Sequence, residues 1–278
     1  MSTPVVDRPS PQYRPVEHRV SAAGLLRAEW IKFWSVRSVA WTMIAAVVAI
    51  VGLGVLLSWA LRDVLADPQA GPAVAAQGVD ATAASLQGAQ MAWLIVAAVG
   101  VIVVAGEYST GMVRTSFTTA PRRLGVLAAK AAVLAVSVLV VTGVSVLAAF
   151  LLGQAVLGER GASLGDDGVA RALVGNVLVL VGFALAGLAV GALMRNTAGA
   201  VCTVLAAIFV VPLLLMAVPE SWGGDTLREY WFSNAPTNLT TVSEVPSYLD
   251  AWAGTGVFAA WVLVLLALGA LVLKRRDV

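Results

Sequence analysis

A glycine-serine motif is the first place where this sequence offers catalytic chemistry. Residues 161–165 read GASLG and match G-x-S-x-G, the pattern that holds a serine nucleophile on a sharp turn. Such a nucleophile needs a histidine base beside it, and His18 is the only histidine in the chain. As argued below from the apolar stretches, the motif lies in a connection between two membrane-spanning helices, and His18 is expected on the opposite side of the membrane. We therefore interpret the match as accidental.

The sequence lacks the residue types that metal sites and nucleotide-binding sites require. With one cysteine, Cys202, and one histidine, the chain lacks the clusters of zinc sites. It contains no H-E-x-x-H motif and no Gly-Lys pair, so it has no Walker motif. We expect no cofactor in this chain. If ATP and Mg²⁺ drive its activity, they bind to another polypeptide. The formal net charge of +2 gives no reason to expect a nucleic-acid partner.

A polar segment at 106–123 is more informative. It reads GEYSTGMVRTSFTTAPRR and is too polar to cross a membrane. Glu107 stands where the preceding apolar stretch ends, and Pro121 ends any helix that begins near Ser109. Basic residues then mark the return to the membrane, namely Arg122, Arg123 and Lys130. The residues alone leave two interpretations open, a short surface helix that docks on a cytoplasmic partner and an ordinary basic loop.

A second segment, 21–38, combines aromatic and basic residues. Ser21 is suited to cap a helix. At 100° per residue, one arc of that helix carries the apolar side chains Leu26, Trp30, Phe33 and Trp34. The remaining arc carries Arg27, Glu29, Lys32 and Ser35. This pattern is typical of an amphipathic helix that lies in the membrane interface, and the alternative is a soluble helix packed on a partner. Residues 1–20 are polar and proline-containing and predict a flexible cytoplasmic tail.

The composition indicates what must position these segments. The chain of 278 residues is 59% apolar and 12% charged, whereas soluble proteins are about 45–50% apolar and about 25% charged. Six continuous apolar stretches approach or exceed the roughly 20 residues that cross a bilayer as a helix. They lie at about 39–61, 89–105, 127–157, 169–194, 198–218 and 254–273. Because the runs do not alternate, they predict helices rather than the strands of a barrel. Residues 39–278 are therefore predicted to form a six-span transmembrane domain.

The basic residues predict the orientation of these spans. Most lysines and arginines fall in the N-terminal segment, the second-to-third and fourth-to-fifth connections, and the C-terminus. Because positive residues are enriched on the cytoplasmic side, both termini are expected to be cytoplasmic and the chain a multi-pass protein of the plasma membrane. The centres of the spans carry no charged residue, which argues against an ion-coupled carrier. Within the spans, Pro212 predicts a kink, and Gly187 with Gly191 forms a G-x-x-x-G motif that permits close helix approach.

These segments together resemble the permease subunits of type-2 ABC exporters. The resemblance covers about residues 21–276. Its most specific part is EYSTGMVR at 107–114, followed by Pro-Arg-Arg at 121–123 and by Lys130. The stretch LLRAEWIK at 25–32 is similar to the N-terminal elbow helix of that family. The loop after the first span is short, without the large outside domain that some members carry.

The resemblance implies an all-α integral membrane protein with six transmembrane helices, an N-terminal amphipathic interfacial helix and a cytoplasmic coupling helix between spans two and three. It implies a second permease copy, identical or different, and a separate cytoplasmic ABC ATPase that binds ATP and Mg²⁺. The coupling segment would dock on that ATPase through Glu107, Ser109, Gly111, Arg114, Pro121, Arg122 and Arg123. The elbow helix would lie against membrane lipid through Leu26, Trp30, Lys32, Phe33 and Trp34. Glu107 and Arg114 are expected to contact the ATPase or the elbow helix.

The expected function is thus that of a non-enzymatic transport subunit, which moves an unidentified amphipathic or apolar substrate. Two other functions stay open at the level of the residues. One is a non-transport membrane scaffold or immunity protein. The other is a membrane-embedded enzyme that modifies lipid through a polar residue such as Ser163 or Asn176, although no catalytic constellation supports it.

Overall fold

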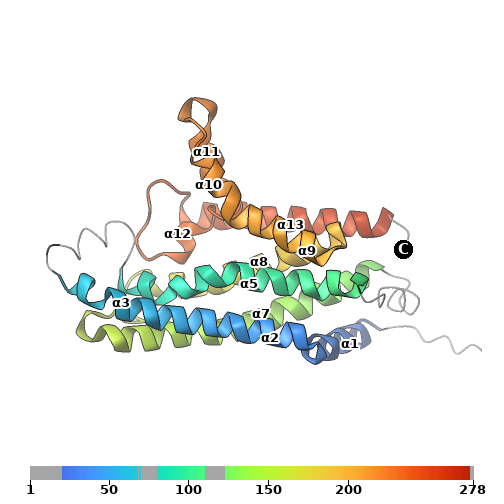
Figure 1. Ribbon diagram of the computed structural model, residues 1–278, viewed down its shortest axis with the longest axis horizontal. Helices are drawn as coiled ribbons and strands as arrows, with labels where there is room; N and C mark the ends of the chain where they lie inside the picture. The colour runs from blue at the N-terminus through green and yellow to red at the C-terminus, as the bar shows by residue number, and fades with distance from the viewer. Residues whose placement is uncertain (1–20, 68, 70–79, 110–122, 276–278) are drawn as a thin grey trace, which may run out of the picture.

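The computed structural model describes residues 21–67, 69, 80–109 and 123–275. Within these ranges the long elements are all helices, and most run side by side along the long axis of the molecule (Figure 1). The first half contains α1 (Ala22–Ser35), α2 (Arg37–Val48), the π-helix η1 (Ala49–Leu53), α3 (Gly54–Ala66), α5 (Ala81–Ser109) and α7 (Arg123–Leu157). The second half contains η2 (Gly158–Arg160), α8 (Val169–Met194), α9 (Thr197–Leu205), the π-helix η3 (Ala206–Val210), α10 (Val211–Leu215), η4 (Glu220–Trp222), α11 (Gly224–Glu229), α12 (Thr237–Thr240) and α13 (Ala251–Arg275).

Six of the described helices are long and apolar enough to cross a membrane, which confirms the predicted number. They are Arg37–Val64, Ala81–Tyr108, Leu124–Arg160, Val169–Met194, Thr197–Leu215 and Ala251–Arg275. The first joins α2, η1 and α3 into one continuous helix, and the fourth has the bounds that hydropathy predicts. These helices support a multi-pass membrane protein of all-helical architecture.

The second of these helices begins at Ala81, earlier than the predicted start near residue 89. The added turns at the start of α5 contain polar residues. Their low hydropathy is the reason why the sequence does not predict them as part of the span. Two of their polar groups bond to α7, because the Nε2 of Gln154 donates to the Oγ of Ser85 at 3.0 Å and to the carbonyl of Ala81 at 3.1 Å. Ser85 is fully buried. The half-buried amide of Gln154 thus holds this turn against the bundle.

The centre of the bundle consists of α5, α7 and α8. At least half of the most apolar part of each is buried inside the protein, whereas less than a quarter is buried in the first, fifth and sixth spans. The most extensive contact joins α5 and α8. The outer three helices leave many large apolar side chains exposed, as a lipid environment requires.

Glycines allow α5 and α8 to approach each other at backbone distance. A Cβ atom added to Gly187 of α8 would lie 2.0 Å from the carbonyl oxygen of Ala97, and one added to Gly100 of α5 would lie 1.9 Å from that of Ala184. Gly191 faces Val101 of α5 in the same way, at 3.1 Å. The predicted G-x-x-x-G motif is therefore a site of close helix packing.

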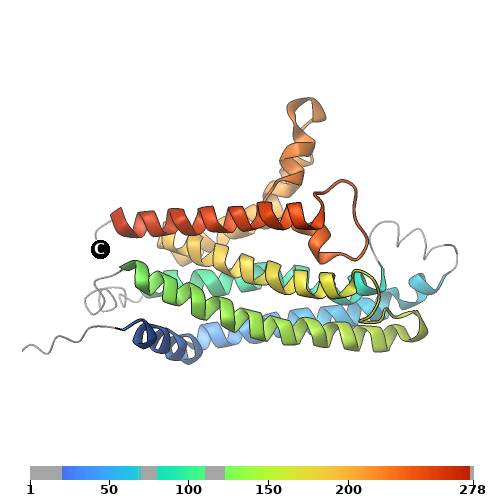
Figure 2. The ribbon, with the colours of Figure 1, turned by 180° about the vertical axis from the view of Figure 1, so that it is seen from behind.

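One end of the bundle gathers several segments that are distant in the sequence. Helix α1, the C-terminal end of α5, the N-terminal end of α7 and the C-terminal end of α13 all lie there (Figures 1 and 2). The C-terminal end of α3 and the C-terminal end of α7 lie at the other end. An even number of spans places the two described chain ends together, as the sequence predicts.

The fifth span leaves the bundle near Pro212, where the sequence predicts a kink. Helix α9 lies along the bundle, whereas α10 and α11 project away from it (Figure 1). Proline has no backbone N–H, so the carbonyls that would accept from Pro212 need other donors. In α-helical register that carbonyl belongs to Ile208, which accepts from the Ser233 hydroxyl at 3.2 Å. In the π register of η3 it belongs to Ala207, which accepts from the Trp231 indole at 2.8 Å. The returning loop therefore satisfies both carbonyls.

The aromatic residues of this loop fall into two groups. Phe232 packs between Phe183 of α8 and Phe258 of α13, with ring centroids 4.9 and 5.3 Å away. Trp222 and Trp252 are largely exposed. From the sequence alone, aromatics at this density either anchor the loop in the headgroup region or line a substrate path. In the structure the buried group packs into the core of the bundle.

The sequence places Asn176, Ser137, Thr142 and Ser145 inside the spans, where they are expected to join helices rather than to line a path. Asn176 of α8 does so, because its Nδ2 donates to the carbonyl of Thr240 at 3.0 Å. Thr142 and Ser145 instead bond to carbonyls within their own helix, those of Val138 and Val141. For these two hydroxyls the expectation is wrong, because a hydroxyl in a helix readily bonds to the carbonyl four residues earlier.

Candidate functional site

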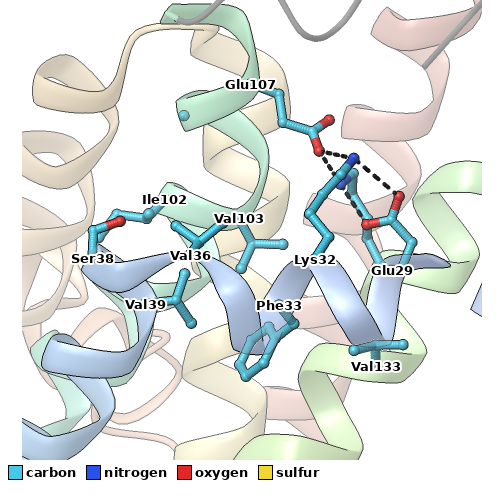
Figure 3. Close-up of a pocket in the computed structure, with 12 residues that line it drawn as sticks. Glu29, Lys32, Phe33, Val36, Ser38, Val39, Ile102, Val103, Glu107 and Val133 are labelled. Carbon is cyan, nitrogen blue, oxygen red and sulfur yellow. Dashed lines mark hydrogen bonds and ion pairs between the residues drawn. The ribbon is translucent and has the colours of Figure 1, made fainter. Parts of the chain in front are cut away.

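A cluster of four charged side chains joins three helices at one end of the bundle (Figure 3). Lys130 of α7 donates from Nζ to the Oε2 of Glu29 at 2.7 Å and to the Oε1 of Glu107 at 2.6 Å. Lys32 of α1 donates to the same Oε1 of Glu107 at 2.5 Å and lies 3.5 Å from the Oε1 of Glu29. Two carboxylates and two ammonium groups thus form a neutral network between α1, α5 and α7.

Local structure explains why these four groups meet. The hydroxyl of Ser21 accepts from the backbone N–H of Gly24 at 3.1 Å and caps α1, as predicted. Glu29 and Lys32 are three residues apart on that helix and so share one face. Glu107 lies at the end of α5 and Lys130 near the start of α7, on either side of the segment 110–122. Because both helix ends lie at the same end of the bundle, their charged residues face α1 together.

The cluster is largely sealed from solvent. The side chains of Lys130, Glu29 and Glu107 are 5%, 8% and 11% exposed, and that of Lys32 is 26% exposed. Removing charges from water is costly unless each charge is paired and hydrogen-bonded. Here each of the two carboxylates contacts both lysines. The geometry is that of a rigid polar joint rather than of a surface salt bridge.

The pKa of Lys32 is raised above its ordinary value. Burial on its own would lower this pKa, but the hydrogen bond and the charge of Glu107, with those of Glu29, outweigh it. A group whose pKa is raised on folding stabilises the folded state fully below its ordinary pKa. That contribution is lost as the pH rises through the pKa in the folded state.

We therefore expect the stability difference between the wild type and Lys32→Gln to be constant from neutral pH up to the ordinary lysine pKa. It should shrink only at higher pH, as Lys32 loses its proton. Unfolding of both proteins in detergent at several alkaline pH values measures this difference. A difference that already shrinks just above neutral pH would contradict the raised pKa.

The structure corrects the helical-wheel interpretation of α1. That interpretation placed Glu29 and Lys32 on the polar face, away from Trp30 and Trp34. In the structure Glu29 is buried against the bundle together with Phe33, whereas four other large apolar residues of α1 are exposed. They are Leu26, Trp30, Ile31 and Trp34. The wheel pattern cannot identify the inner face, because the ion partners Glu107 and Lys130 lie on other helices.

The predicted coupling-segment residues are placed only in part. Glu107 lies in the cluster and contacts α1, one of the two alternatives expected for it. Ser109 ends α5 and Arg123 begins α7. The other predicted residues lie outside the described part of the chain, namely Gly111, Arg114, Pro121 and Arg122. Lys130 was predicted to mark re-entry into the membrane, and its role as the centre of the cluster was missed. Its position inside an otherwise apolar stretch was the available signal.

A further cationic residue lies at this end of the bundle. The guanidinium carbon of Arg195, between α8 and α9, lies 5.2 Å from the ring centroid of Tyr108 at the end of α5. Arg195 caps α8 in the left-handed region, with φ at 53°. The contact adds a cation–π interaction at the end of α5, at the residue that follows Glu107.

The G-x-S-x-G segment forms a turn in the loop before α8. The Ser163 hydroxyl accepts from the backbone N–H of Gly165 at 3.3 Å, and the Ser163 N–H donates to Asp166 at 2.8 Å. His18 lies outside the described residues. The described geometry is that of a small side-chain-capped turn between two helices, and not that of a strand followed by a helix.

Comparison with models of protein families and with curated proteins gave no match to this chain.

Proposed function

We propose that this chain is the transmembrane permease subunit of an ATP-driven ABC exporter. It works as a pair of permease subunits in the plasma membrane, with both termini in the cytoplasm. The cargo is an amphipathic or apolar compound, which suits six spans whose centres carry no charge. A cytoplasmic partner ATPase binds ATP and Mg²⁺ and supplies the energy. The proposal rests on the resemblance of 25–32 and 107–130 to that family, and on the geometry of the ion cluster.

The ion cluster is the observation that carries the proposal. Glu107 and Lys130 flank the segment 110–122, which would dock on the ATPase. Glu107 binds to Lys32 of the elbow helix, and Lys130 binds to Glu29 of the same helix. Separating these helices would leave buried charges unpaired. The free energy of that state is far higher than that of a joint movement of the helices as one unit. A push on the docking segment is therefore transmitted to α1, α5 and α7 as to one body.

Association with an ATPase is the direct test. The chain is extracted from its native membrane in a mild detergent, and we expect a separate ATPase subunit to co-purify with it. Exchanging Arg122 and Arg123 for glutamate should reduce that co-purification strongly, because the docking surface would change from basic to acidic.

The matched control carries the same charge reversal at the other end of the bundle, with Arg62→Glu and Arg160→Glu. This variant should retain the ATPase. Equal loss from both variants, or a preparation that never contains an ATPase, would contradict the proposal. ATP-driven flux in reconstituted vesicles then separates a transporter from a scaffold that merely binds the ATPase.

A further inference from the structure

A cavity of about 250 Å³ adjoins the ion cluster (Figure 3). It lies between α1, α2, α5 and α7. One end is formed by Glu29, Lys32, Glu107 and Lys130. The remaining walls are largely apolar and include Phe33, Val36, Val39, Ile102, Val103 and Val133. The cavity thus has a charged end and an apolar body. These two parts match the polar head and the apolar tail of an amphiphile.

The position of the cavity favours entry from the membrane surface. It lies beside the joint between α1 and α2, where Val36 leaves helical geometry with φ −80° and ψ 110°. Val36 and Ser38 line the cavity and are also exposed. The outer face of the neighbouring α1 exposes Trp30 and Trp34, residues that sit at the headgroup level of membranes. A molecule lying in the membrane leaflet beside α1 can therefore reach the cavity past the exposed residues Val36 and Ser38.

The charged end favours an anionic head. Glu29 and Glu107 already accept hydrogen bonds or ion pairs from lysines. Lys32 is the most exposed member of the cluster. Its ammonium group has three donors, one of which is bonded to Glu107, while Glu29 lies 3.5 Å away as an ion pair. A carboxylate or phosphate can accept from a remaining donor. A cationic head would find both carboxylates already paired, and a neutral apolar molecule would leave the donor unused.

We propose that this cavity binds an amphiphile with one acyl chain and a carboxylate or phosphate head. The chain fills the apolar body, and the head accepts a hydrogen bond from Lys32. A bound amphiphile then contacts all three helices that the ion cluster joins, and it holds the joint at Val36 in place. This assignment stands on the cavity alone and does not depend on the transport function.

The test uses a photoactivatable fatty acid and the full-length protein in discs of neutral phosphatidylcholine. After irradiation, we expect the label on peptides that contain residues 33–39 and 102–107. The fatty alcohol with the same chain should label these peptides about tenfold less, which is the worth of one charge-assisted hydrogen bond. Lys32→Gln should lower labelling by the acid to the level of the alcohol. A long-chain alkyl phosphate and free inorganic phosphate, added as competitors, separate an amphiphile from a soluble anion.

A filling variant and its control complete the experiment. Val103→Trp places a large ring in the cavity and should abolish the specific label. Val140→Trp makes the same exchange on the exposed face of α7 and should leave the label unchanged. Label spread evenly over the exposed spans, equal labelling by acid and alcohol, or competition by inorganic phosphate alone would each overturn the proposal. Because the comparison of acid with alcohol uses the wild type, the proposal can be tested even if a variant fails to fold.

Discussion

Replacing Lys130 by methionine should destabilise the protein by about 3–5 kcal/mol, the cost of leaving a buried charge without its partner. Methionine retains the length of the side chain but removes the donor that joins Glu29 and Glu107. Of the two lysines of the cluster, only Lys32 would then remain beside the two carboxylates. The free energy of unfolding, measured in mixed detergent and SDS micelles, gives this cost. If the chain docks on an ATPase as proposed, the same variant should also retain less ATPase in a co-purification assay, because the segment 110–122 would lose its tie to α1.

Two controls isolate the network from general effects of the exchange. Lys274→Met alters a lysine that is exposed at the same end of the bundle and should change stability little. The double variant Lys130→Met with Glu29→Leu removes a complete pair and leaves Lys32 bound to Glu107. It should be less destabilised than the sum of the single variants, with a coupling of about 0.5–3 kcal/mol. Additive effects would show that the four residues do not act as one network.

Replacing Gly187 by alanine should destabilise the bundle by about 3 kcal/mol, the upper part of the range for overpacked interiors. The added methyl group would lie 2.0 Å from the carbonyl oxygen of Ala97, so the backbones of α5 and α8 would have to separate. Backbone atoms cannot rotate away as the end of a side chain can. Gly100→Ala should act in the same way, because it lies against Ala184 on the same interface. Unfolding in SDS micelles measures both effects.

Gly256 offers a matched control within the sixth span. A Cβ atom at this position meets no other atom within 4 Å. Because alanine is the better helix former by about 1 kcal/mol, Gly256→Ala should leave the protein equally stable or more stable. If Gly187→Ala were tolerated as well as Gly256→Ala, the close approach of α5 and α8 would not be essential to the bundle.

The membrane architecture is largely predictable from the sequence, because each span is a local signal. An apolar run of sufficient length predicts its own helix, and α8 has the predicted bounds for that reason. Predictions fail where the stabilising partner is remote in sequence. The turn at Ala81 depends on Gln154 of another helix, and the path of the chain after Pro212 depends on Trp231 and Ser233.

The candidate site was predictable only as separate parts. The residues identify 21–38 as a helix with aromatic and charged faces and mark Glu107 as the end of a span. They do not indicate that Glu29 turns inward or that Lys130 lies between two carboxylates, because such pairing depends on three helix ends meeting in space. The cavity next to them is equally beyond local reasoning, since its walls come from four helices.

The packing of α5 against α8 also has a consequence for how the protein is made. The ribosome releases α5 first, then α7, and only afterwards α8, which supplies the facing side of α5. Until Val169–Met194 has entered the bilayer, the surface of α5 around Gly100 faces lipid or the translocation machinery. Nascent chains that stall before this point lack their interior and are natural targets for membrane quality-control proteases. The fourth span therefore completes the central contact of the bundle, that between α5 and α8.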